Sequence, residues 1–433
     1  MAWKWPQTDQ KKKPMTTREV YDVIVVGAGA SGMIAAGRAA RMGARVLLVE
    51  KMPRPGRKLL ITGKGRCNIT HDAVPEVYYQ NIFPQGRFLR HAFKVFFTAD
   101  ILKILHDRGV STTTERGRRV FPVSNSALDV VRALSQWMSE YPLTVRYRSR
   151  VTEVLAENGR VKGVCVEGEG GSSFFYGSKV ILCTGGKSYP ATGSTGDGYD
   201  LARRLGHSLT DIHPALVPLL TEGDLAGRLQ GLGLKHVNAV VWADGKKQAE
   251  EFGELMFAHY GLTGPIILSL SRGVVGALSE GKRVEIAIDL KPALDQKKLD
   301  ARLLRDLNAH GKKQLENLFK SWLPSKLIPV FLDLLNIEGK KPCHQMGAGE
   351  RKKILLLMKD FRFVVKGHPG FQEAIITAGG IPTAEIRSRT MESKIVNGLY
   401  FAGELIDLDA NTGGFNLQIA FSTAWLAGGS AAG

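Results

Sequence analysis

A glycine-rich turn at residues 27–32 (Gly-Ala-Gly-Ala-Ser-Gly) constrains the fold more than any other feature of this chain. Residues 21–26 form a short β-branched run, which predicts a buried parallel strand. Residues 33–42 predict an alanine-rich helix, and residues 45–49 predict a second strand that ends at Glu50. The glycines alone would be a weak signal. The strand before them, the helix after them and the acid about 20 residues on predict a dinucleotide-binding βαβ unit.

Each residue type in this unit has a physical reason. Gly27 permits the tight turn, Gly29 lets the backbone approach a pyrophosphate at the helix N-terminus, and Gly32 lets the helix pack on the strand. The Glu50 carboxylate can accept hydrogen bonds from both ribose hydroxyls, which favours an unphosphorylated ribose, as in FAD or NAD. The alternative is a glycine turn without a ligand. The predicted cofactor residues here are Gly27, Gly29, Ala30, Ser31, Gly32, Glu50 and Lys51.

The C-terminal end of the chain favours FAD over NAD. Residues 398–404 predict a strand that ends in a glycine and an acid, and residues 417–427 predict a final apolar helix. In flavoproteins with two dinucleotide-binding motifs, the late acid holds the ribityl chain. The N-terminus of the last helix carries roughly half a positive charge and faces the flavin pyrimidine. An ordinary strand and helix are the alternative. The predicted contacts are Gly403, Glu404, Thr412, Gly413, Gly414, Phe415 and Asn416.

A middle strand adds a third predicted piece of the site. Residues 180–183 predict a buried strand that ends in Thr-Gly-Gly, after a small β excursion over residues 145–176. Residues 192–198 also contain glycines, but in the wrong order and without a preceding strand. We therefore expect a nicotinamide reductant, NAD(P)H, to bind only transiently. The predicted FAD contacts in this region are Val151, for adenine, and Thr184, Gly185 and Gly186.

The loop at residues 56–68 (GRKLLITGKGRCN) combines glycines, cations and one thiol. That composition suits a loop that runs along a cofactor and faces a second, anionic molecule. We expect Arg66 to capture a substrate anion or to stabilise the charge of reduced flavin; an ordinary surface cation is the alternative. Cys67 either donates a proton or packs inertly against the flavin. The predicted cofactor residues of the loop are Lys58, Gly63, Gly65, Arg66, Cys67 and Asn68.

His259 is the best general-acid candidate among the 10 histidines, because imidazole titrates near neutral pH. A histidine satisfied by backbone contacts is the equally plausible alternative. The predicted catalytic residues are therefore Cys67, His259 and Arg66. The sequence has no Ser-His-Asp, Walker or metal-ligand pattern, so no metal site is expected.

The pattern of the chain changes after residue 206. Residues 207–290 alternate apolar segments with turn signals and predict a β-rich insertion. Residues 291–345 carry leucines at helical spacing and predict a helical insertion, and residues 346–370 are expected to return to the β-rich insertion. The remaining segments are a basic tail (residues 1–20) and the two parts of the FAD-binding domain (residues 21–206 and 371–433).

The chain is strongly basic, with 59 Lys and Arg against 41 Asp and Glu and a net charge of +18. Residues 291–370 hold 17 of these cations and 8 of the acids, which is half of the excess. A lysine-rich solvated surface would explain this pattern, and so would a footprint for a polyanion such as RNA. No apolar run reaches membrane-spanning length, and the N-terminus has no secretory pattern. With four widely spaced cysteines, we expect a cytoplasmic protein without disulfides.

Several longer motifs resemble one bacterial flavoprotein family from about residue 21 to residue 428. They are GRKLLITGKGRCNIT, VFPVS, ELMFAHYGLTGP, SRTMESK and GGFNLQIAFSTAWLAG. The family is the BaiN/RdsA (YhiN-like) family, which includes a ribosomal RNA dihydrouridine synthase, a bile-acid dehydroxylation flavoprotein and an aminoacetone oxidase. The resemblance implies an α/β, Rossmann-like, two-dinucleotide-binding flavoprotein domain with a β-rich insertion and a small helical insert. It does not fix the substrate.

Three functions stay open at this point. The preferred one is an FAD-dependent reductase that forms dihydrouridine in 23S ribosomal RNA. Hydride would pass from reduced flavin to carbon 6 of uracil, and Cys67 or His259 would protonate carbon 5. The second is a small-molecule oxidase or reductase acting on an amine or enone. The third is a non-catalytic RNA-binding factor that keeps FAD as a structural group. The oligomeric state is not set by the sequence.

Overall fold

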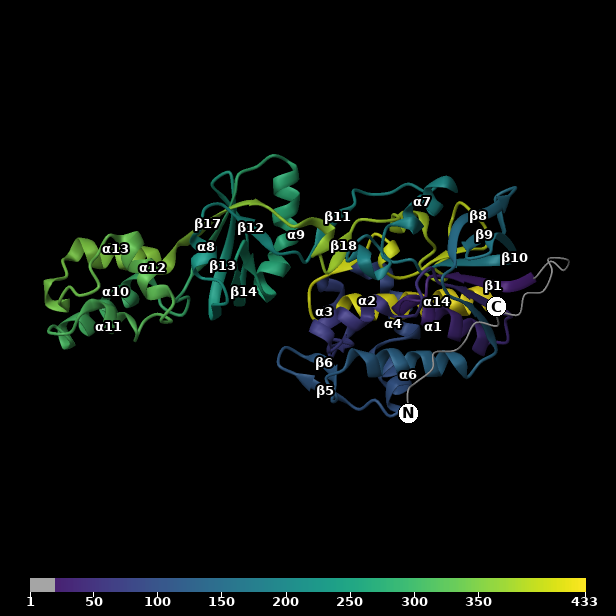
Figure 1. Ribbon diagram of the computed structural model, residues 1–433, viewed down its shortest axis with the longest axis horizontal. Coiled ribbons are helices and arrows are strands. Elements are labelled where there is room, and N and C mark those ends of the chain that lie inside the picture. Colours follow the sequence, from purple (N-terminus) through teal and green to yellow (C-terminus); the bar gives the residue numbers. More distant parts are fainter. Residues whose placement is uncertain (1–19) are drawn as a thin grey trace. The chain divides into compact units, whose positions relative to one another are not determined.

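The computed structural model describes residues 20–433, which divide into two compact units (Figure 1). The first unit holds the described residues up to Pro214 and those from Ile375 onward. The second is the continuous stretch Ala215–Ala374. The predicted basic tail lies outside the described residues, apart from Val20 at its end. Among residues 20–433, no helix has the length and apolar character that crossing a bilayer requires.

The first unit is built on a seven-stranded sheet of order β7-β2-β1-β10-β9-β8, with β19 also paired to β10. Strands β7, β2, β1, β10 and β19 pair in parallel, whereas β8 and β9 form an antiparallel extension. Parallel strands are covered on both faces, which is why β2 (Val-Leu-Leu-Val) contains only apolar residues. The bounds are β1 Val20–Val26, β2 Val46–Val49, β7 Leu143–Arg146, β8 Arg150–Glu157, β9 Arg160–Gly168, β10 Gly171–Leu182 and β19 Leu399–Phe401.

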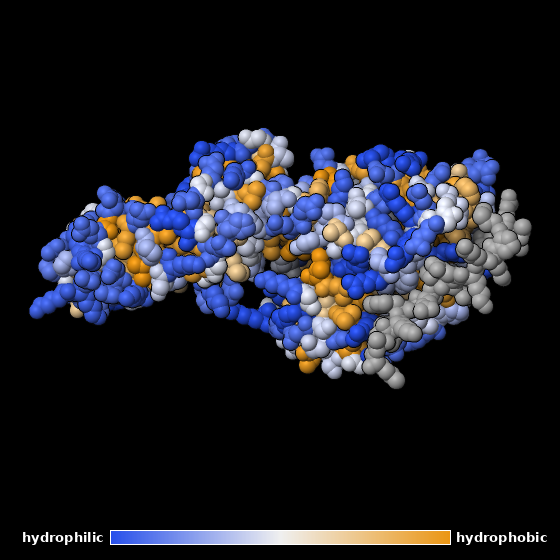
Figure 2. Space-filling model, in the orientation of Figure 1, coloured by the Kyte–Doolittle hydropathy of each residue, from blue (hydrophilic) through white to orange (hydrophobic). Residues whose placement is uncertain are grey.

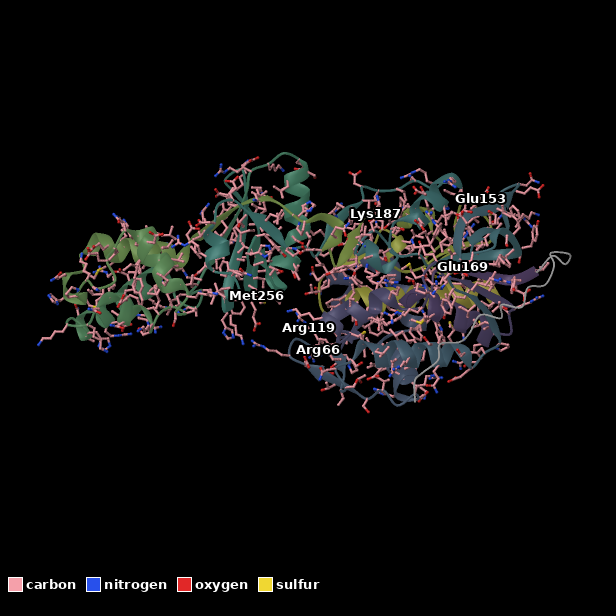
Figure 3. All side chains as sticks on the ribbon, viewed as in Figure 1. Arg66, Arg119, Glu153, Glu169, Lys187 and Met256 are labelled. Atoms are coloured by element: carbon pink, nitrogen blue, oxygen red, sulfur yellow. The ribbon has the colours of Figure 1, made fainter. Side chains whose placement is uncertain are left out.

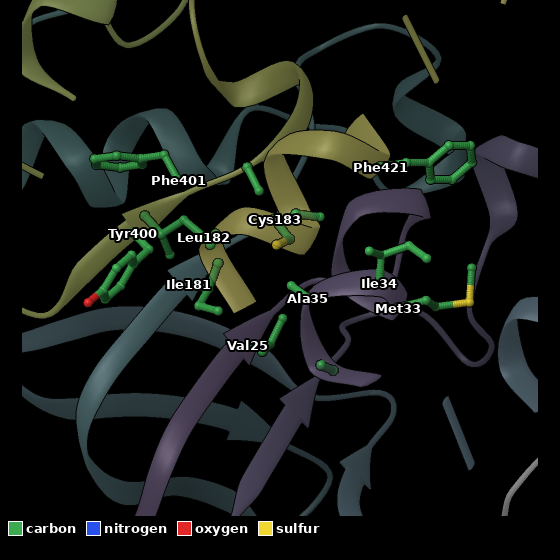
Figure 4. Close-up of a cluster of buried hydrophobic side chains, with 14 of the residues drawn as sticks. Val25, Met33, Ile34, Ala35, Ile181, Leu182, Cys183, Tyr400, Phe401 and Phe421 are labelled. Carbon is green, nitrogen blue, oxygen red and sulfur yellow. The ribbon is translucent and has the colours of Figure 1, made fainter. Parts of the chain in front are cut away.

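The core of this unit joins the two ends of the chain (Figure 4). Val25, Ile181 and Phe401 come from three neighbouring strands and are fully buried. Ile34 of α1 and Phe421 of α14 are fully buried in the same cluster. The first and last segments therefore depend on one shared core for their stability. The longer helices of this unit are α1 Ala30–Arg41, α5 Thr98–His106, α6 Ala127–Ser139, α7 Asp197–Arg204 and α14 Phe415–Ala432.

A small sheet of order β3-β6-β5 lies against the N-terminus of α14. A Cβ atom added to Gly414, the residue before α14, would lie 2.4 Å from the backbone of Thr70 in β3, so only glycine fits there. This close approach places the loop at residues 56–68 and the last helix in one region. The bounds are α2 Arg57–Ile61, β3 Thr70–His71, α3 Pro75–Asn81, β4 Ile82–Phe83, α4 Arg90–Val95, β5 Thr112–Glu115, β6 Arg119–Pro122 and β20 Asp409–Ala410.

The second unit contains a closed barrel of order β12-β15-β14-β13-β16-β17. Alternation along β13 sends Val237, Ala239 and Val241 into its core, as a half-buried strand requires. Helix α9 packs against β14 with Ile266 and Ile267 buried. The bounds are β12 Leu219–Thr221, α8 Leu225–Arg228, β13 Gly233–Ala243, β14 Lys246–Ala258, β15 Gly261–Thr263, α9 Pro265–Ser279, β16 Val284–Asp289 and β17 Phe361–Gly367.

Four helices follow β16: α10 Gln296–Ala309, α11 Leu315–Phe319, α12 Leu327–Leu335 and α13 Ala348–Lys359. Helix α13 occupies residues that we had placed in the returning β segment, so that boundary was wrong. The helix begins where Glu350 accepts a hydrogen bond from Gly347 N at 2.9 Å, and it buries Ile354 and Met358. Within residues 346–370, only β17 is a strand of the barrel. The chain leaves and re-enters the first unit through the paired strands β11 His213–Ala215 and β18 Ile376–Ala378.

A buried hydrogen-bond chain fastens the SRTMESK segment to the first unit. His207 Nδ1 lies 2.7 Å from Glu385 Oε2, and its Nε2 lies 2.8 Å from Ser393 Oγ. Because the carboxylate can only accept, Nδ1 carries the proton and Ser393 donates to Nε2. Ser393 Oγ also accepts from the backbone N–H groups of Ile395 and Val396. Both ring nitrogens and the hydroxyl group are engaged in hydrogen bonds. The cluster is therefore structural and offers no free nucleophile.

Replacing His207 with glutamine should lower the melting temperature most at neutral pH. Burial holds the pKa of His207 below its usual 6.5. A depressed histidine pKa contributes stability that is fully present above the unfolded pKa and is lost as pH falls through the folded pKa. The wild-type melting temperature should therefore fall below about pH 6.5, and more gently in the variant. Melting curves from pH 5 to 8 test this, with exposed His310→Gln as the control; parallel profiles for both variants would contradict it.

Candidate functional site

The turn after β1 is shaped to receive a pyrophosphate. Gly27 has φ +96° and its added Cβ would lie 2.7 Å from Cys183 O, so the position requires glycine. An added Cβ on Gly32 would lie 1.7 Å from Gly27 O. At Gly29, by contrast, an added Cβ meets nothing within 4 Å, so the backbone faces open space where helix α1 begins. Backbone N–H groups at such a helix N-terminus bind phosphate.

Glu50 stands at the end of β2 with its carboxylate held by two backbone donors. Its Oε2 accepts from Ala28 N at 2.6 Å and its Oε1 from Met52 N at 2.8 Å. A carboxylate has about four acceptor positions, so two remain for the hydroxyls of a ribose. Burial raises the pKa of Glu50. The buried Tyr147 hydroxyl, whose pKa burial and the Glu50 charge raise, has no hydrogen-bond partner in the described chain.

Val151, the predicted adenine contact, lines a cavity of the first unit together with Arg150, Thr152 and Leu201. The predicted residue Lys51 lies near this end of the site. Its Nζ bonds Asp197 Oδ2 at 2.9 Å and Thr195 Oγ1 at 2.5 Å. Lys51 is thus held in an ion pair, and its role is to fix the segment before α7 rather than to offer a free charge.

The Glu404 carboxylate, which follows β19, joins three segments of the predicted FAD site. It accepts from Lys58 Nζ at 2.6 Å, from Ser188 Oγ at 2.8 Å and from Thr377 N at 2.9 Å. An added Cβ on Gly186 would lie 2.8 Å from Glu404 Oε1, so the Thr-Gly-Gly segment passes directly beside the acid. Three predicted pieces, the loop, the middle strand and the late strand, therefore meet at one carboxylate.

Two further buried polar atoms of predicted residues lack a partner among residues 20–433. They are Thr184 Oγ1, after β10, and Asn68 Oδ1, after the loop. An unpaired buried polar atom costs about 1–3 kcal/mol. A bound group with many donors and acceptors would satisfy such atoms. The residues present therefore fit a dinucleotide with a polar chain.

In the loop at residues 56–68, Arg66 is partly exposed and bonded to neighbouring residues, whereas Cys67 is fully buried. Arg66 stacks on Phe121 at 4.2 Å, donates to Asn125 Oδ1 at 2.6 Å and forms an ion pair with Glu115. It is therefore anchored to the β5–β6 hairpin. Cys67 is 0% exposed, and burial raises the pKa of its thiol to about 12. The thiol is protonated at neutral pH and packs in the core. Gly63 and Gly65 have φ +57° and +85°.

His71 is a polar residue of this region that the sequence reasoning missed. Its ring stacks on Phe415 at 4.3 Å, and its Nδ1 lies 3.1 Å from Gly413 O. Because a carbonyl only accepts, Nδ1 carries the proton and Nε2 keeps a lone pair. Burial, together with Arg119 and Arg118, holds the pKa of His71 below 6.5. A two-residue strand gives no periodicity, so only its place three residues after Asn68 could have drawn attention to it.

The other predicted residues occupy structural positions. Asn416 clamps strand β20 through two hydrogen bonds to the backbone of Ala410, at 2.9 and 2.8 Å. Gly403 N donates to Thr423 Oγ1 at 3.0 Å, which ties the late strand to α14. His259 belongs to the second unit, in the turn between β14 and β15, where it is exposed and packs edge-on to Tyr260 at 4.7 Å.

This fold and these contacts define a flavoprotein of the two-dinucleotide-binding class. The predicted fold class is confirmed: a Rossmann domain with a parallel sheet and helices, joined to a separate β-rich region that contains a barrel. Residues 21–430 match the family described as HI0933-like protein Rossmann domain, and the chain belongs to this family of FAD-dependent oxidoreductases. The family resemblance read from the motifs is confirmed.

Two curated relatives extend over nearly the whole chain. The 3-dehydro-bile acid delta(4,6)-reductase of Clostridium scindens is 31% identical over 94% of this chain and 98% of its own length. The ribosomal RNA dihydrouridine synthase of Escherichia coli is 31% identical over 94% of this chain and 97% of its own. Among solved structures, the Mycobacterium smegmatis Sdh1 complex in the apo form shares the fold, with a TM-score of 0.50 at 18% identity over 96% of this chain and 68% of that one.

Proposed function

We propose that this protein is a cytoplasmic FAD-dependent reductase that forms dihydrouridine in 23S ribosomal RNA. Positive charge is the observation that favours RNA over a small molecule, because residues 291–370 hold 17 Lys and Arg against 8 Asp and Glu. Relatives from Escherichia coli and Haemophilus influenzae that carry the dihydrouridine synthase name support it. The following lysines of that segment are exposed and form no ion pair with any described residue: Lys297, Lys312, Lys313, Lys340, Lys352 and Lys353.

The reaction reduces the carbon 5–carbon 6 double bond of uracil with one hydride and one proton. Reduced FAD supplies the hydride when bound, and NAD(P)H, binding transiently, is the proposed source of its electrons. A base inside folded RNA must first be unstacked, at a cost of a few kcal/mol. Phosphate contacts from the basic surface would offset that cost. Much of the face of α10–α13 that Figure 2 shows is hydrophilic.

In this proposal the residues around the turn, the loop and Glu404 hold FAD. Glu50 binds the ribose hydroxyls, the open backbone at Gly29 admits the pyrophosphate, and Glu404 accepts from the ribityl chain. Arg66, Cys67 and His259 stay the catalytic candidates. His71 joins them, because its Nε2 lone pair can accept from an imide N–H of uracil or flavin. The Cys67 thiol is protonated at neutral pH because burial raises its pKa. Since it is 0% exposed, it could donate this proton only to an acceptor in direct contact with it.

A second candidate function is reduction of a small enone. It is favoured by one observation, the 31% identity to the 3-dehydro-bile acid delta(4,6)-reductase. The two functions share the flavin chemistry and differ in the need for polyanion binding. A protein that acts on a small neutral molecule should bind ribosomal RNA no more tightly than its net charge requires. An RNA-binding factor with structural FAD would instead bind RNA but leave uridine unchanged.

The deciding measurement is nucleoside mass spectrometry of 23S ribosomal RNA with and without the gene. We expect dihydrouridine to disappear in the deletion strain and to return with the wild-type gene. A gene encoding Gly29→Val, whose FAD affinity should be weaker, should restore less dihydrouridine, whereas the exposed-turn variant Gly170→Val should restore it fully. Unchanged dihydrouridine in the deletion strain would refute the RNA substrate. Full restoration by a Gly29→Val protein that is measured to hold no FAD would refute flavin catalysis.

A further inference from the structure

Three cations lie in or near the loop at residues 56–68 of the first unit. They are outside residues 291–370, which hold half of the excess positive charge. We call Lys64, Arg118 and Arg119 the basic rim. Arg119 stands directly opposite His71 on the paired strands β3 and β6, and Arg118 Nη1 donates to Asp72 O at 3.1 Å. Lys64 lies in the loop that Arg66 anchors to the same hairpin. Arg66 and Arg119 are labelled in Figure 3.

The rim carries charge that the protein itself does not neutralise. Within residues 20–433, none of Lys64, Arg118 and Arg119 forms an ion pair. Glu115 is the residue across from Arg119 in the β5–β6 ladder, yet its carboxylate pairs with Arg66. The Asp72 carboxylate is within electrostatic reach of His71, but Asp72 bonds Arg118 only through backbone atoms: its carbonyl oxygen accepts from Arg118 Nη1 and its N–H donates to Arg118 O. Lys64 in the loop and the two adjacent arginines at the start of β6 are thus left without an acidic partner among the described residues.

The backbone at two rim residues is strained in a way that a plain surface loop would not need. Lys64 has φ +59° and Arg118 has φ +55°, although neither is glycine. A non-glycine residue in the left-handed region costs of order 1–3 kcal/mol and persists where the surroundings or a function demand it. Glycine would relieve that cost at both positions. The chain has a long cationic side chain at each, so the charge is kept at the expense of local stability.

We propose that the basic rim binds phosphodiester groups of RNA on either side of the base that reaches the flavin. This inference rests on the proposed function and names the surface that holds the substrate there. Arg119 of the rim lies on the sheet that carries His71, and His71 packs on Phe415 at the start of α14. Phosphates bound at the rim would therefore hold the neighbouring nucleotide near the α14 N-terminus. Arginine suits this task because its planar guanidinium binds phosphate oxygens in pairs.

The test measures the affinity of FAD-loaded protein for a 23S ribosomal RNA transcript at several salt concentrations. In Arg118→Gln/Arg119→Gln we expect weaker binding and a shallower dependence of log affinity on log salt, by about 0.7 to 0.9 for each phosphate that the variant no longer neutralises. Lys64→Gln alone should give about half of that change. The control is Arg148→Gln/Lys162→Gln, which removes the same charge from the β7–β8 connection and β9, where each cation is exposed and pairs with a glutamate.

Three outcomes of these binding measurements can be distinguished. Equal affinity and equal salt dependence in the rim and control variants would overturn the proposal, provided that both retain FAD and their melting temperature. If the rim variant instead loses binding to vesicles of anionic lipid while RNA binding is unchanged, the rim serves a membrane surface and the proposal fails. Failure of the proposed function looks different: rim variants would lose RNA affinity, yet wild-type protein would leave uridine unreduced.

Discussion

Replacing Gly29 with valine should leave a folded protein that binds FAD more weakly than the wild type. The φ of Gly29 is −76°, which a side chain tolerates, and an added Cβ meets nothing within 4 Å. The side chain would instead fill the space that a pyrophosphate needs. Overpacking costs about 1–3 kcal/mol, which weakens FAD affinity roughly 5- to 150-fold. Fluorescence titration of the apoprotein with FAD measures this.

The comparison with Gly32 makes this prediction specific. Gly32→Ala would place its Cβ 1.7 Å from Gly27 O, so it should disturb the turn and lower the melting temperature as well as the FAD affinity. Gly170→Val adds a side chain to another open position and should change neither. Unaltered FAD affinity in Gly29→Val would show that the cofactor does not approach this turn, and the assignment of the dinucleotide site would be wrong.

Replacing Glu404 with glutamine should both destabilise the protein and impair FAD binding. The side chains of Lys58 and Glu404 are only 23% and 13% exposed, so the variant leaves an ammonium group with no carboxylate in a mostly dry site. Removing one partner of a fully buried pair costs about 3–5 kcal/mol, and this half-buried pair should cost less. The midpoint of urea unfolding should fall accordingly. FAD affinity should fall as well, because a neutral amide accepts more weakly than a carboxylate.

The double variant Lys58→Met/Glu404→Gln separates these two effects. Removing the Lys58 ammonium should restore much of the unfolding midpoint, because no unpaired charge is then left in the half-buried site. It should not restore FAD affinity, because the amide at position 404 is still a weaker acceptor than the carboxylate. The four proteins form a double-mutant cycle, measured by urea unfolding and FAD titration. Additive losses in the midpoint would contradict the coupling that the 2.6 Å contact indicates.

The glycine turn was predictable because its physics is local. Gly27, Gly32 and Glu50 are separated by fixed spacings within one βαβ unit, and the structure places them at the turn and at the end of β2, as expected. The same reasoning worked for the late strand, where Glu404 follows β19 at the expected offset. Short motifs with a strict backbone requirement can be read from sequence, since few other residues satisfy them.

Partners distant in sequence could not be predicted in that way. Arg66 was expected to face a ligand, but Glu115 and Asn125, which hold it, lie 49 and 59 residues farther along the chain. Cys67 looked reactive in its loop, and only the packing around it shows a buried thiol. Helix α13 was mistaken for part of a β segment because lysines and leucines alternate irregularly there, and burial on one face emerges only when α10 packs against it.

The paired strands β11 and β18 mean that the excursion starts and finishes at adjoining points of the oxidoreductase scaffold. Residues 215–374 could therefore be replaced by another domain, or shortened to a hairpin turn, during evolution without a change in the topology of the first unit. Exchange of this stretch is one way in which relatives that share the nucleotide-binding unit could come to carry names as different as bile acid reductase and ribosomal RNA dihydrouridine synthase.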